Sequence, residues 1–459
     1  MKAFTRVFSG LLLVCTLGIF SLWRYESLPD VSKFGTALQD AVGQIGAVTD
    51  LIEGGIPIVN PIIPPKNDAD AGEDIPYVEA DLVTAPDEAF EATMLAAIAA
   101  RETAINVSAL KMDTAQFKQT ISRFFFTHPE LFYVSTAYRI GTIAGSTTVR
   151  TVQLEYLMDA EDIPAAIDGF NAAVDEICAG VSPSDSDFDK ILYLHDYFVK
   201  NYSYDHEGLA AGTAIRDAYN FFVQKTGVCQ AYMLGLIAAC NEVGLECLPV
   251  TSTEMNHAWN LVKIDGQWYH IDVTWDDAGG ESEPVYPSYI SYDYFLLSSE
   301  ELYTGGRNVH WDATERADDT LYDDAIWRGE VQLPMVKCAE NYYCIFYEGM
   351  SPVIYAGTPT QMQAVKVLAG VNWGSPGGGS YLESWAGFAV HGEELIFNTA
   401  QALWCYDVVS NEMERIVDLS DSLGDLQIFG IVEVEGNVVS YVAAQDYHGS
   451  FELRTYQII

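Results

Sequence analysis

Two stretches of this 459-residue chain decide its fold: GVCQAYMLGLIAACNEVGLECLPV at 227–250 and HAWNLVKIDGQWYHIDVTWDD at 257–277. In the first stretch, apolar residues recur at steps of three and four, which indicates one buried face of an amphipathic helix. The helix is expected to follow a turn at 225–227, to carry Cys229 on its first turn and to end at Gly244. Backbone N–H groups at such a helix start stabilise a thiolate or a developing oxyanion.

The second stretch predicts a β-hairpin from His257 to Val273. Two strand-like runs flank Asp265-Gly266, a dipeptide typical of two-residue hairpin turns. With that register, His257 and Asp272 are diagonal neighbours on one face, with Cβ atoms about 7 Å apart. The other face is mostly apolar and is expected to pack on the core; it carries Ala258, Val262, Ile264, Tyr269, Ile271 and Val273.

Cys229, His257 and Asp272 have the residue types of a thiol nucleophile, its general base and the acid that orients the base. Each also has a structural interpretation. A buried cysteine is commonly a packing residue, a strand histidine is usually structural, and an aspartate in a strand next to a tryptophan often caps or bridges. The ordered set of three favours the catalytic interpretation.

The remaining cysteines and histidines near these stretches are expected to be structural. Cys240 and Cys247 lie within apolar runs, and His195 lies in a predicted helix far upstream of the motif. His270 shares the predicted face with His257 but lies on the other side of Asp272, nearer the turn. The chain contains no C-x-x-C or H-x-x-x-H pair. The sequence therefore predicts neither a metal site nor a cofactor.

The runs G-V-C-x-A-Y, H-A-W-N and G-x-W-Y-x-I-D-x-T-W-D-D closely resemble the transglutaminase-like superfamily, in its bacterial secreted branch, over about residues 185–300. The resemblance implies an α+β, papain-like core in which the nucleophile helix packs on an antiparallel sheet. It implies Cys229 as nucleophile, His257 as general base and acid, and Asp272 as the orienting residue. It also implies that Trp259 and Trp275 wall the substrate site or pack beneath it.

Such a site attacks an amide carbonyl, releases an amine and holds the acyl group as a thioester. Water then makes the protein a protease or amidase, whereas a second amine makes it a transglutaminase. The same three residues serve both outcomes, so the motif leaves the choice open. We expect hydrolysis of a protein or peptide substrate, with cell-wall peptide as one candidate. The alternative is a non-catalytic cell-surface binding protein that retains the fold.

The chain is expected to divide into five segments. Lys2 and Arg6 precede an apolar run at 7–23, which favours export over the alternative of a buried N-terminal helix. The protein is then secreted or anchored to the membrane, and contacts the membrane only through this segment. The segments are a signal peptide or signal anchor at 1–25, a flexible Pro/acid-rich linker at 26–79, an α+β extension at 80–180, the transglutaminase-like catalytic domain at 181–328, and an all-β meander module, sandwich or partial propeller, at 329–459.

The formal net charge is −42, from 23 basic and 65 acidic residues. This excess excludes nucleic acid as a partner, because phosphate binding needs basic surface. Solubility outside the cell explains the charge most simply, and a preference for cationic substrates explains it more specifically. The eight scattered cysteines do not form a disulfide framework, although a local bridge between Cys338 and Cys344 stays open. The sequence predicts no oligomeric state.

Overall fold

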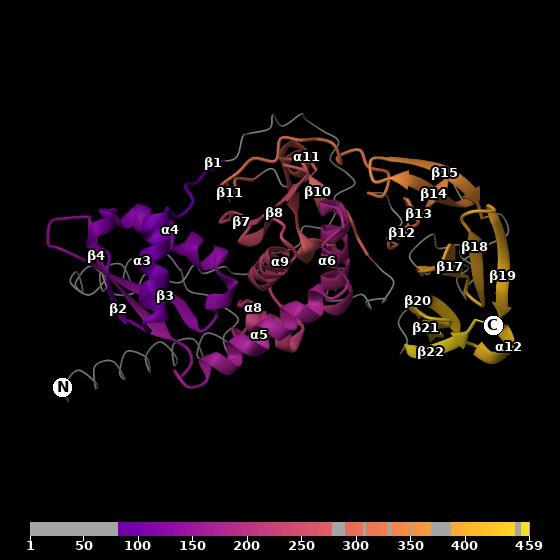
Figure 1. Ribbon diagram of the computed structural model, residues 1–459, viewed down its shortest axis with the longest axis horizontal. Helices are drawn as coiled ribbons and strands as arrows, with labels where there is room; N and C mark the ends of the chain where they lie inside the picture. The colour runs from indigo at the N-terminus through magenta and orange to yellow at the C-terminus, as the bar shows by residue number, and fades with distance from the viewer. Residues whose placement is uncertain are drawn as a thin grey trace, which may run out of the picture. The chain divides into compact units, whose positions relative to one another are not determined.

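The computed structural model describes residues 81–277, 290–305, 309–328, 333–348, 351–368, 387–445 and 451–458. The predicted signal segment 1–25 and linker 26–79 lie outside the described residues. The fold class is mixed α and β, with mostly antiparallel sheets and a strand-rich C-terminal part, as predicted (Figure 1). Among the described residues, no helix is both long and apolar enough to cross a membrane.

The N-terminal part combines two helices with a three-stranded sheet. An aspartate caps the N-terminus of each helix: the side chain of Asp87 accepts from the N–H of Phe90, and that of Asp113 accepts from the N–H of Gln116. Gln116 reaches back to the N–H of Asp113 and completes a capping box. The elements are α3 (Glu88–Ala99), α4 (Thr114–Thr127) and a sheet in the order β2 (Ala104–Asn106), β4 (Val149–Tyr156), β3 (Val134–Thr142).

The central part places helix α9 (Cys229–Val243) against a mostly antiparallel sheet, with three further helices around the helix (Figure 1). These helices are α5 (Ile163–Cys178), α6 (Asp187–Asn201) and α8 (Ala218–Gln224). The sheet has the order β1 (Asp81–Leu82), β11 (Asp312–Ala313), β7 (Cys247–Ser252), β8 (His257–Ile264), β9 (Gln267–Ile271), β10 (Phe295–Leu297). Among the described strands of this sheet, only β1 and β11 pair in parallel. Shorter helices are α7 (His206–Ala211), α10 (Val273–Asp276) and α11 (Ser299–Thr304).

Helix α9 has the predicted bounds but not the predicted amphipathic character. It begins at Cys229, and its C-cap Gly244 has a φ of 76°, which suits glycine. Every residue from Cys229 to Cys240 is buried, not one face alone. The sheet covers one side, and α5, α6 and α8 contact the others. The nucleophile candidate therefore stands at the start of a central core helix.

The predicted hairpin forms with the predicted register. Ile264 pairs with Gln267, and Asp265 and Gly266 have φ values of 49° and 84°, as a type I′ turn requires. All six residues of the predicted apolar face belong to the core cluster around α9. The prediction that the strand reaches Val273 is wrong, because pairing stops at Ile271 and the chain enters α10. The side chain of Asp272 accepts from the backbone N–H groups of Thr274 and Trp275, and so competes with the strand ladder.

Replacing Gly266 by alanine should lower the free energy of unfolding by about 1 kcal/mol, because its positive φ is strained for any other L residue. A Cβ at this position meets no atom within 4 Å, so the cost comes from the backbone alone. Urea unfolding followed by circular dichroism measures it. An unchanged stability would contradict the observed turn type.

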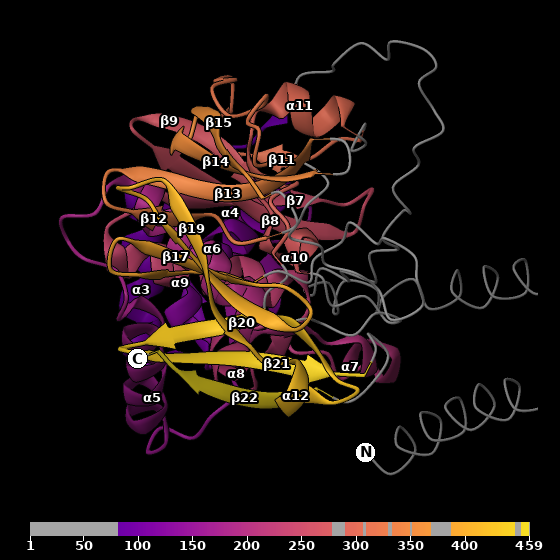
Figure 2. The same ribbon diagram turned by 90° about the vertical axis from the view of Figure 1, so that its right-hand side faces the viewer.

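The C-terminal part consists of three meandering sheets, in agreement with the all-β meander module predicted from the sequence. Figure 2 shows them in succession. One apolar cluster joins the first sheet to the second and another joins the second to the third, which favours a partial propeller over a sandwich. The sheets are β12 (Val336–Cys338), β13 (Asn341–Glu348), β14 (Ser351–Thr358) and β15 (Gln361–Val367); β16 (Phe388–His391), β17 (Glu394–Asn398), β18 (Ala402–Asp407) and β19 (Glu412–Asp418); and, after α12 (Ser420–Leu423), β20 (Gln427–Glu435), β21 (Val438–Ala444) and β22 (Glu452–Gln457).

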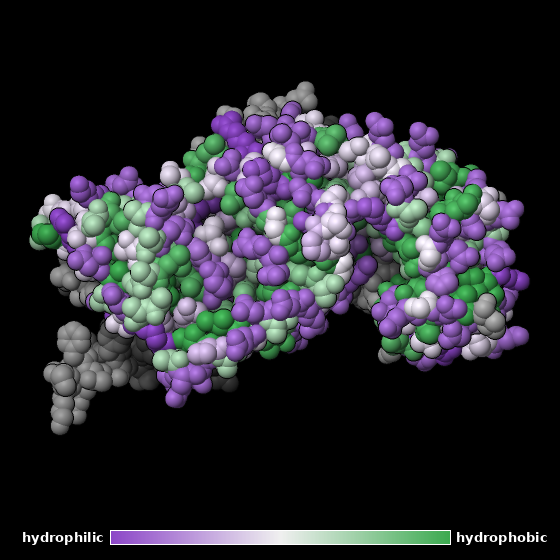
Figure 3. Space-filling model, viewed as in Figure 1, coloured by the Kyte–Doolittle hydropathy of each residue, from purple (hydrophilic) through white to green (hydrophobic). Residues whose placement is uncertain are grey.

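The disulfide considered from the sequence does not form. Cys338 and Cys344 are free thiols, so the local disulfide considered from the sequence is absent from the described residues. The sulfur of Cys344 instead lies 3.3 Å from that of Met362, and Cys338 faces the carbonyl oxygen of Gly392. Hydrophilic side chains spread over the helices and sheets of the face in Figure 3, interrupted by apolar patches.

Candidate active site

Cys229 is the first residue of α9 and is 1% exposed. It follows strand β6 (Thr226–Gly227), and the N-cap Val228 has no side-chain oxygen that caps the helix. Backbone N–H groups of the first helical turn lack intrahelical acceptors. The sulfur therefore stands where the helix offers N–H donors and a positive dipole end to an anion.

His257 and Asp272 meet directly, from opposite arms of the hairpin. Nε2 of His257 lies 2.6 Å from Oδ2 of Asp272, and the two residues are 1% and 2% exposed. The other carboxylate oxygen accepts the N–H groups of Thr274 at 3.1 Å and Trp275 at 3.2 Å. Asp272 thus both caps α10 and fixes the orientation of the imidazole.

Asp272 contacts only one nitrogen of the His257 ring and leaves the other, Nδ1, unused. Nδ1 is buried and makes no hydrogen bond of ordinary geometry to a residue that the structure describes. Burial alone lowers the pKa of His257, but the charge and hydrogen bond of Asp272, followed by those of Cys229, outweigh burial and raise this pKa to about 9. The structure thus brings Cys229, His257 and Asp272 together, with His257 in the middle and cationic at neutral pH.

Both tryptophans of the predicted site stack on His257. The ring centroids of Trp259 and Trp275 lie 5.6 Å and 5.1 Å from that of the imidazole. Trp259 is 1% exposed and donates its indole N–H to Nδ1 of His270 at 3.0 Å. It therefore packs beneath the site and does not wall it, whereas Trp275 remains half-buried. His270 also contacts Ser299 at 3.1 Å and has a structural role, as expected.

Sequence reasoning missed Asp276, which ties α10 to α6. His195 is fully buried, and its two nitrogens lie 3.1 Å from Asp196 and 3.1 Å from Asp276. Burial lowers the pKa of His195, but hydrogen bonds and charge from both aspartates raise it to about 9. The next residue, Asp277, accepts from the hydroxyl of Tyr232 on α9. The helix that Asp272 caps is thus held by two core helices. Partners 81 residues apart leave no local signal for this contact.

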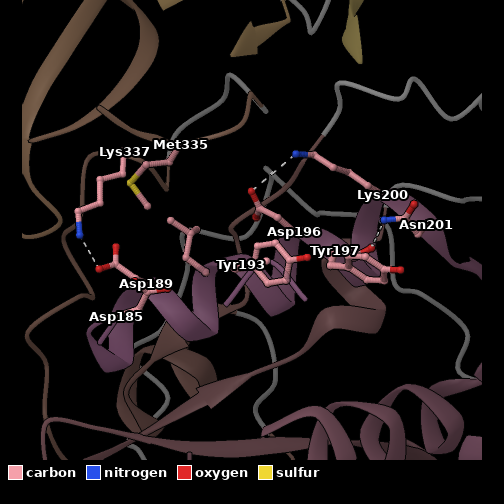
Figure 4. A pocket seen from close by; sticks show the side chains of 11 residues that line it. Asp185, Asp189, Tyr193, Asp196, Tyr197, Lys200, Asn201, Met335 and Lys337 are labelled. Carbon is pink, nitrogen blue, oxygen red and sulfur yellow. Dashed lines mark hydrogen bonds and ion pairs between the residues drawn. The ribbon is translucent and has the colours of Figure 1, made fainter. Parts of the chain in front are cut away.

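A cavity of about 390 Å³ lies along α6 and is lined in part by Asp196, but not by Cys229, His257 or Asp272 (Figure 4). Its charged groups are largely paired: Lys337 contacts Asp189 at 2.5 Å, and Lys200 lies 4.0 Å from Asp196. We therefore assign no ligand to it. In the part of the chain that the structure describes, no group of three or more His, Cys, Asp or Glu side chains is arranged to hold a metal ion.

Residues 174–273 match the family model of the transglutaminase-like superfamily, and this range contains the cysteine, histidine and aspartate described above. The chain carries a transglutaminase-like domain. The predicted resemblance is thereby confirmed. No curated protein matches the chain.

Two solved structures are similar to parts of this chain. One is a TGase crystal structure, with 17% sequence identity and a TM-score of 0.22; the similarity covers 38% of this chain and 51% of the TGase chain. A proposed cysteine protease from Cytophaga hutchinsonii has 14% identity and a TM-score of 0.19, covering 30% and 61%. The chain thus spans about half and about three fifths of their lengths. At such low TM-scores, the two similarities carry no argument about this protein.

Proposed function

We propose that the transglutaminase-like domain is a cysteine-dependent acyl-transfer enzyme. In this proposal Cys229 is the nucleophile, His257 the general base and acid, and Asp272 the residue that orients His257. The observation that carries it is the buried imidazole of His257. Its Nε2 lies 2.6 Å from Asp272, and Cys229 raises its pKa through a hydrogen bond and charge. A cationic ring beside a thiol favours the thiolate, which is the nucleophilic form.

The proposed reaction begins with attack of the Cys229 sulfur on the carbonyl carbon of an amide. The carbonyl oxygen becomes an oxyanion, which backbone N–H groups at the start of α9 stabilise. Collapse of the intermediate breaks the C–N bond, and the leaving amine takes a proton from His257. A thioester remains on Cys229. His257, again a base, then activates water for hydrolysis or an amine for transfer.

We further propose that hydrolysis of a protein or peptide outside the cell is the main outcome, with residues 1–25 serving for export or anchoring. The formal net charge of −42 favours cationic peptides as substrates. Cell-wall peptide is a separate candidate, which the resemblance to the superfamily suggests. Turnover of a lysine-rich peptide should then fall as salt is added, because screening weakens the attraction. Turnover that is independent of salt would remove charge as a basis for substrate choice.

Labelling with iodoacetamide at pH 6 tests the assignment of the nucleophile. All seven cysteines from Cys178 onward are buried, so exposure does not single out Cys229. We expect Cys229 to react at least about tenfold faster than Cys240 or Cys247, because only a thiolate is nucleophilic at this pH. Mass spectrometry of tryptic peptides measures the rate at each site.

Two histidine variants complete the labelling experiment. His257→Gln should remove the selectivity for Cys229, because the thiolate loses its cationic neighbour. His270→Gln is the matched control: His270 is as deeply buried on the same hairpin, but bonds Trp259 and Ser299. Circular dichroism confirms that both variants fold. Equal, slow labelling of every cysteine in the wild-type protein would favour the non-catalytic binding protein.

A further inference from the structure

The hydroxyl of Tyr204 is a buried polar group for which no hydrogen-bond partner exists among the described residues. Buried hydroxyl groups in folded proteins nearly always have a partner, so each exception calls for an explanation. A ligand oxygen that accepts the hydrogen bond is one such explanation, if the hydroxyl faces a site. Tyr204 lies beside the chain segment that leads into Cys229.

The backbone fixes Tyr204 beside the start of α9. Strand β5 (Ser203–Tyr204) pairs in parallel with β6, and Tyr204 lies opposite Gly227, two residues before Cys229. The N–H of Asp205 also donates to the carbonyl oxygen of Gly227 at 3.0 Å. A Cβ on Gly227 would lie 2.7 Å from the Cβ of Ala231, so the segment before Cys229 is closely packed.

The charges of two members of the proposed catalytic set act on this hydroxyl. The pKa of Tyr204 lies above its usual value, first because of burial and then because of the charge of Cys229, which Arg216 opposes and Asp272 reinforces. The phenol therefore keeps its proton at neutral pH and is available as a donor. Its ring packs against that of His206, at 4.8 Å between centroids.

We propose that Tyr204 is a further catalytic residue, whose hydroxyl donates a hydrogen bond to the substrate carbonyl oxygen while Cys229 attacks. This rests on the proposed function. As the S–C bond forms, the carbonyl π electrons move onto oxygen, and the Tyr204 O–H and the N–H groups of α9 bind that oxyanion without giving up a proton. When the electrons return, the C–N bond breaks and the amine leaves with the proton of His257.

Two reagents applied to the full-length protein separate this role from reactivity of the thiol itself. p-Nitrophenyl acetate acylates a thiol through a tetrahedral oxyanion, and its release of nitrophenolate is followed by absorbance. Iodoacetamide alkylates the same sulfur at a saturated carbon, where no oxyanion forms. Tyr204→Phe should slow acylation of Cys229 by about 10²–10³-fold and leave alkylation unchanged, because only one oxyanion donor is removed. Tyr202→Phe is the matched control: burial first, and then the charges of Tyr197 and Glu176, raise the pKa of Tyr202, and neither residue belongs to the proposed catalytic set. Both of its rates should equal those of the wild-type protein.

The remaining outcomes separate the two proposals. Acylation of Tyr204→Phe at the wild-type rate overturns the role of Tyr204 and leaves the proposed function intact. A wild-type protein that is alkylated selectively at Cys229 but not acylated also overturns the role of Tyr204 alone. Failure of both reagents at Cys229 of the wild-type protein overturns the proposed function, and the role of Tyr204 with it. If Tyr204→Phe loses both reactions while circular dichroism shows that it is folded, Tyr204 supports the reactivity of the Cys229 thiol itself. This result overturns its role as an oxyanion donor.

Discussion

Replacing Asp272 by asparagine is expected to lower kcat/KM for p-nitrophenyl acetate by about 10⁴, while the protein remains folded. The carboxylate now accepts from Nε2 of His257 at 2.6 Å and supplies the charge that raises the pKa of this histidine to about 9. An asparagine has no charge and offers its NH₂ group in one of its two orientations. Burial then lowers the pKa of His257 with only Cys229 opposing it, and the ring loses the tautomer that the reaction needs.

The stability of this variant should stay near that of the wild-type protein. Oδ1 of Asp272 accepts the N–H groups of Thr274 and Trp275, and an asparagine oxygen performs the same cap. Asp272→Ala removes the cap as well, and should lower the free energy of unfolding by about 1 kcal/mol more. If Asp272→Asn keeps full activity and only Asp272→Ala is impaired, Asp272 is a helix cap and does not act through His257.

The contact between His257 and Asp272 could be predicted because it depends on local sequence alone. Asp265-Gly266 sets a two-residue turn, and the turn sets the register that brings the two side chains onto one face. The point where the strand ends could not be read in the same way. It depends on the Asp272 side chain, which captures the N–H groups of the following residues once the chain has begun to turn.

Helix α9 shows a second feature that the sequence pattern could not predict, its burial on all sides. Its apolar periodicity and Gly244 determined its start and end, but residues such as Gly235 and Ala239 look neutral in a sequence pattern. Gly235 lies against the rings of Phe221 and Phe222 on α8, where a Cβ would come within 2.9 Å of Phe221. Small residues there mark close helix packing, which becomes visible only when the covering helices are known. The same holds for Tyr204, whose significance depends on its pairing with Gly227.

Replacing His195 by phenylalanine should lower the free energy of unfolding by about 3–5 kcal/mol, as breaking a buried ion pair does. Phenylalanine keeps the ring contacts with Tyr292 and Phe295, at 5.3 Å and 4.8 Å between centroids, but removes both N–H groups. Burial already holds the pKa of Asp276 above its usual value, against the hydrogen bond from His195. Without His195, this fully buried carboxylate loses its cation, and α10 loses its attachment to α6. His391→Phe is the control, because His391 pairs with Glu394 at the surface and such pairs contribute at most about 1 kcal/mol.

The pH dependence of unfolding distinguishes loss of charge from loss of packing in this variant. The pKa values of His195 and His257 are both raised from 6.5 to about 9, so the folded protein holds both protons more tightly than the unfolded chain. Their contribution to stability is complete below pH 6.5 and is lost as pH rises through about 9. Urea unfolding between these limits should show a decline in the wild-type protein that is smaller in His195→Phe, where His257 and His128, whose pKa is also raised, against burial, by Glu130 and Glu91, still titrate. An equally steep decline in both proteins would mean that His195 is neutral when folded, and that the His195 contacts hold α10 by packing and uncharged hydrogen bonds alone.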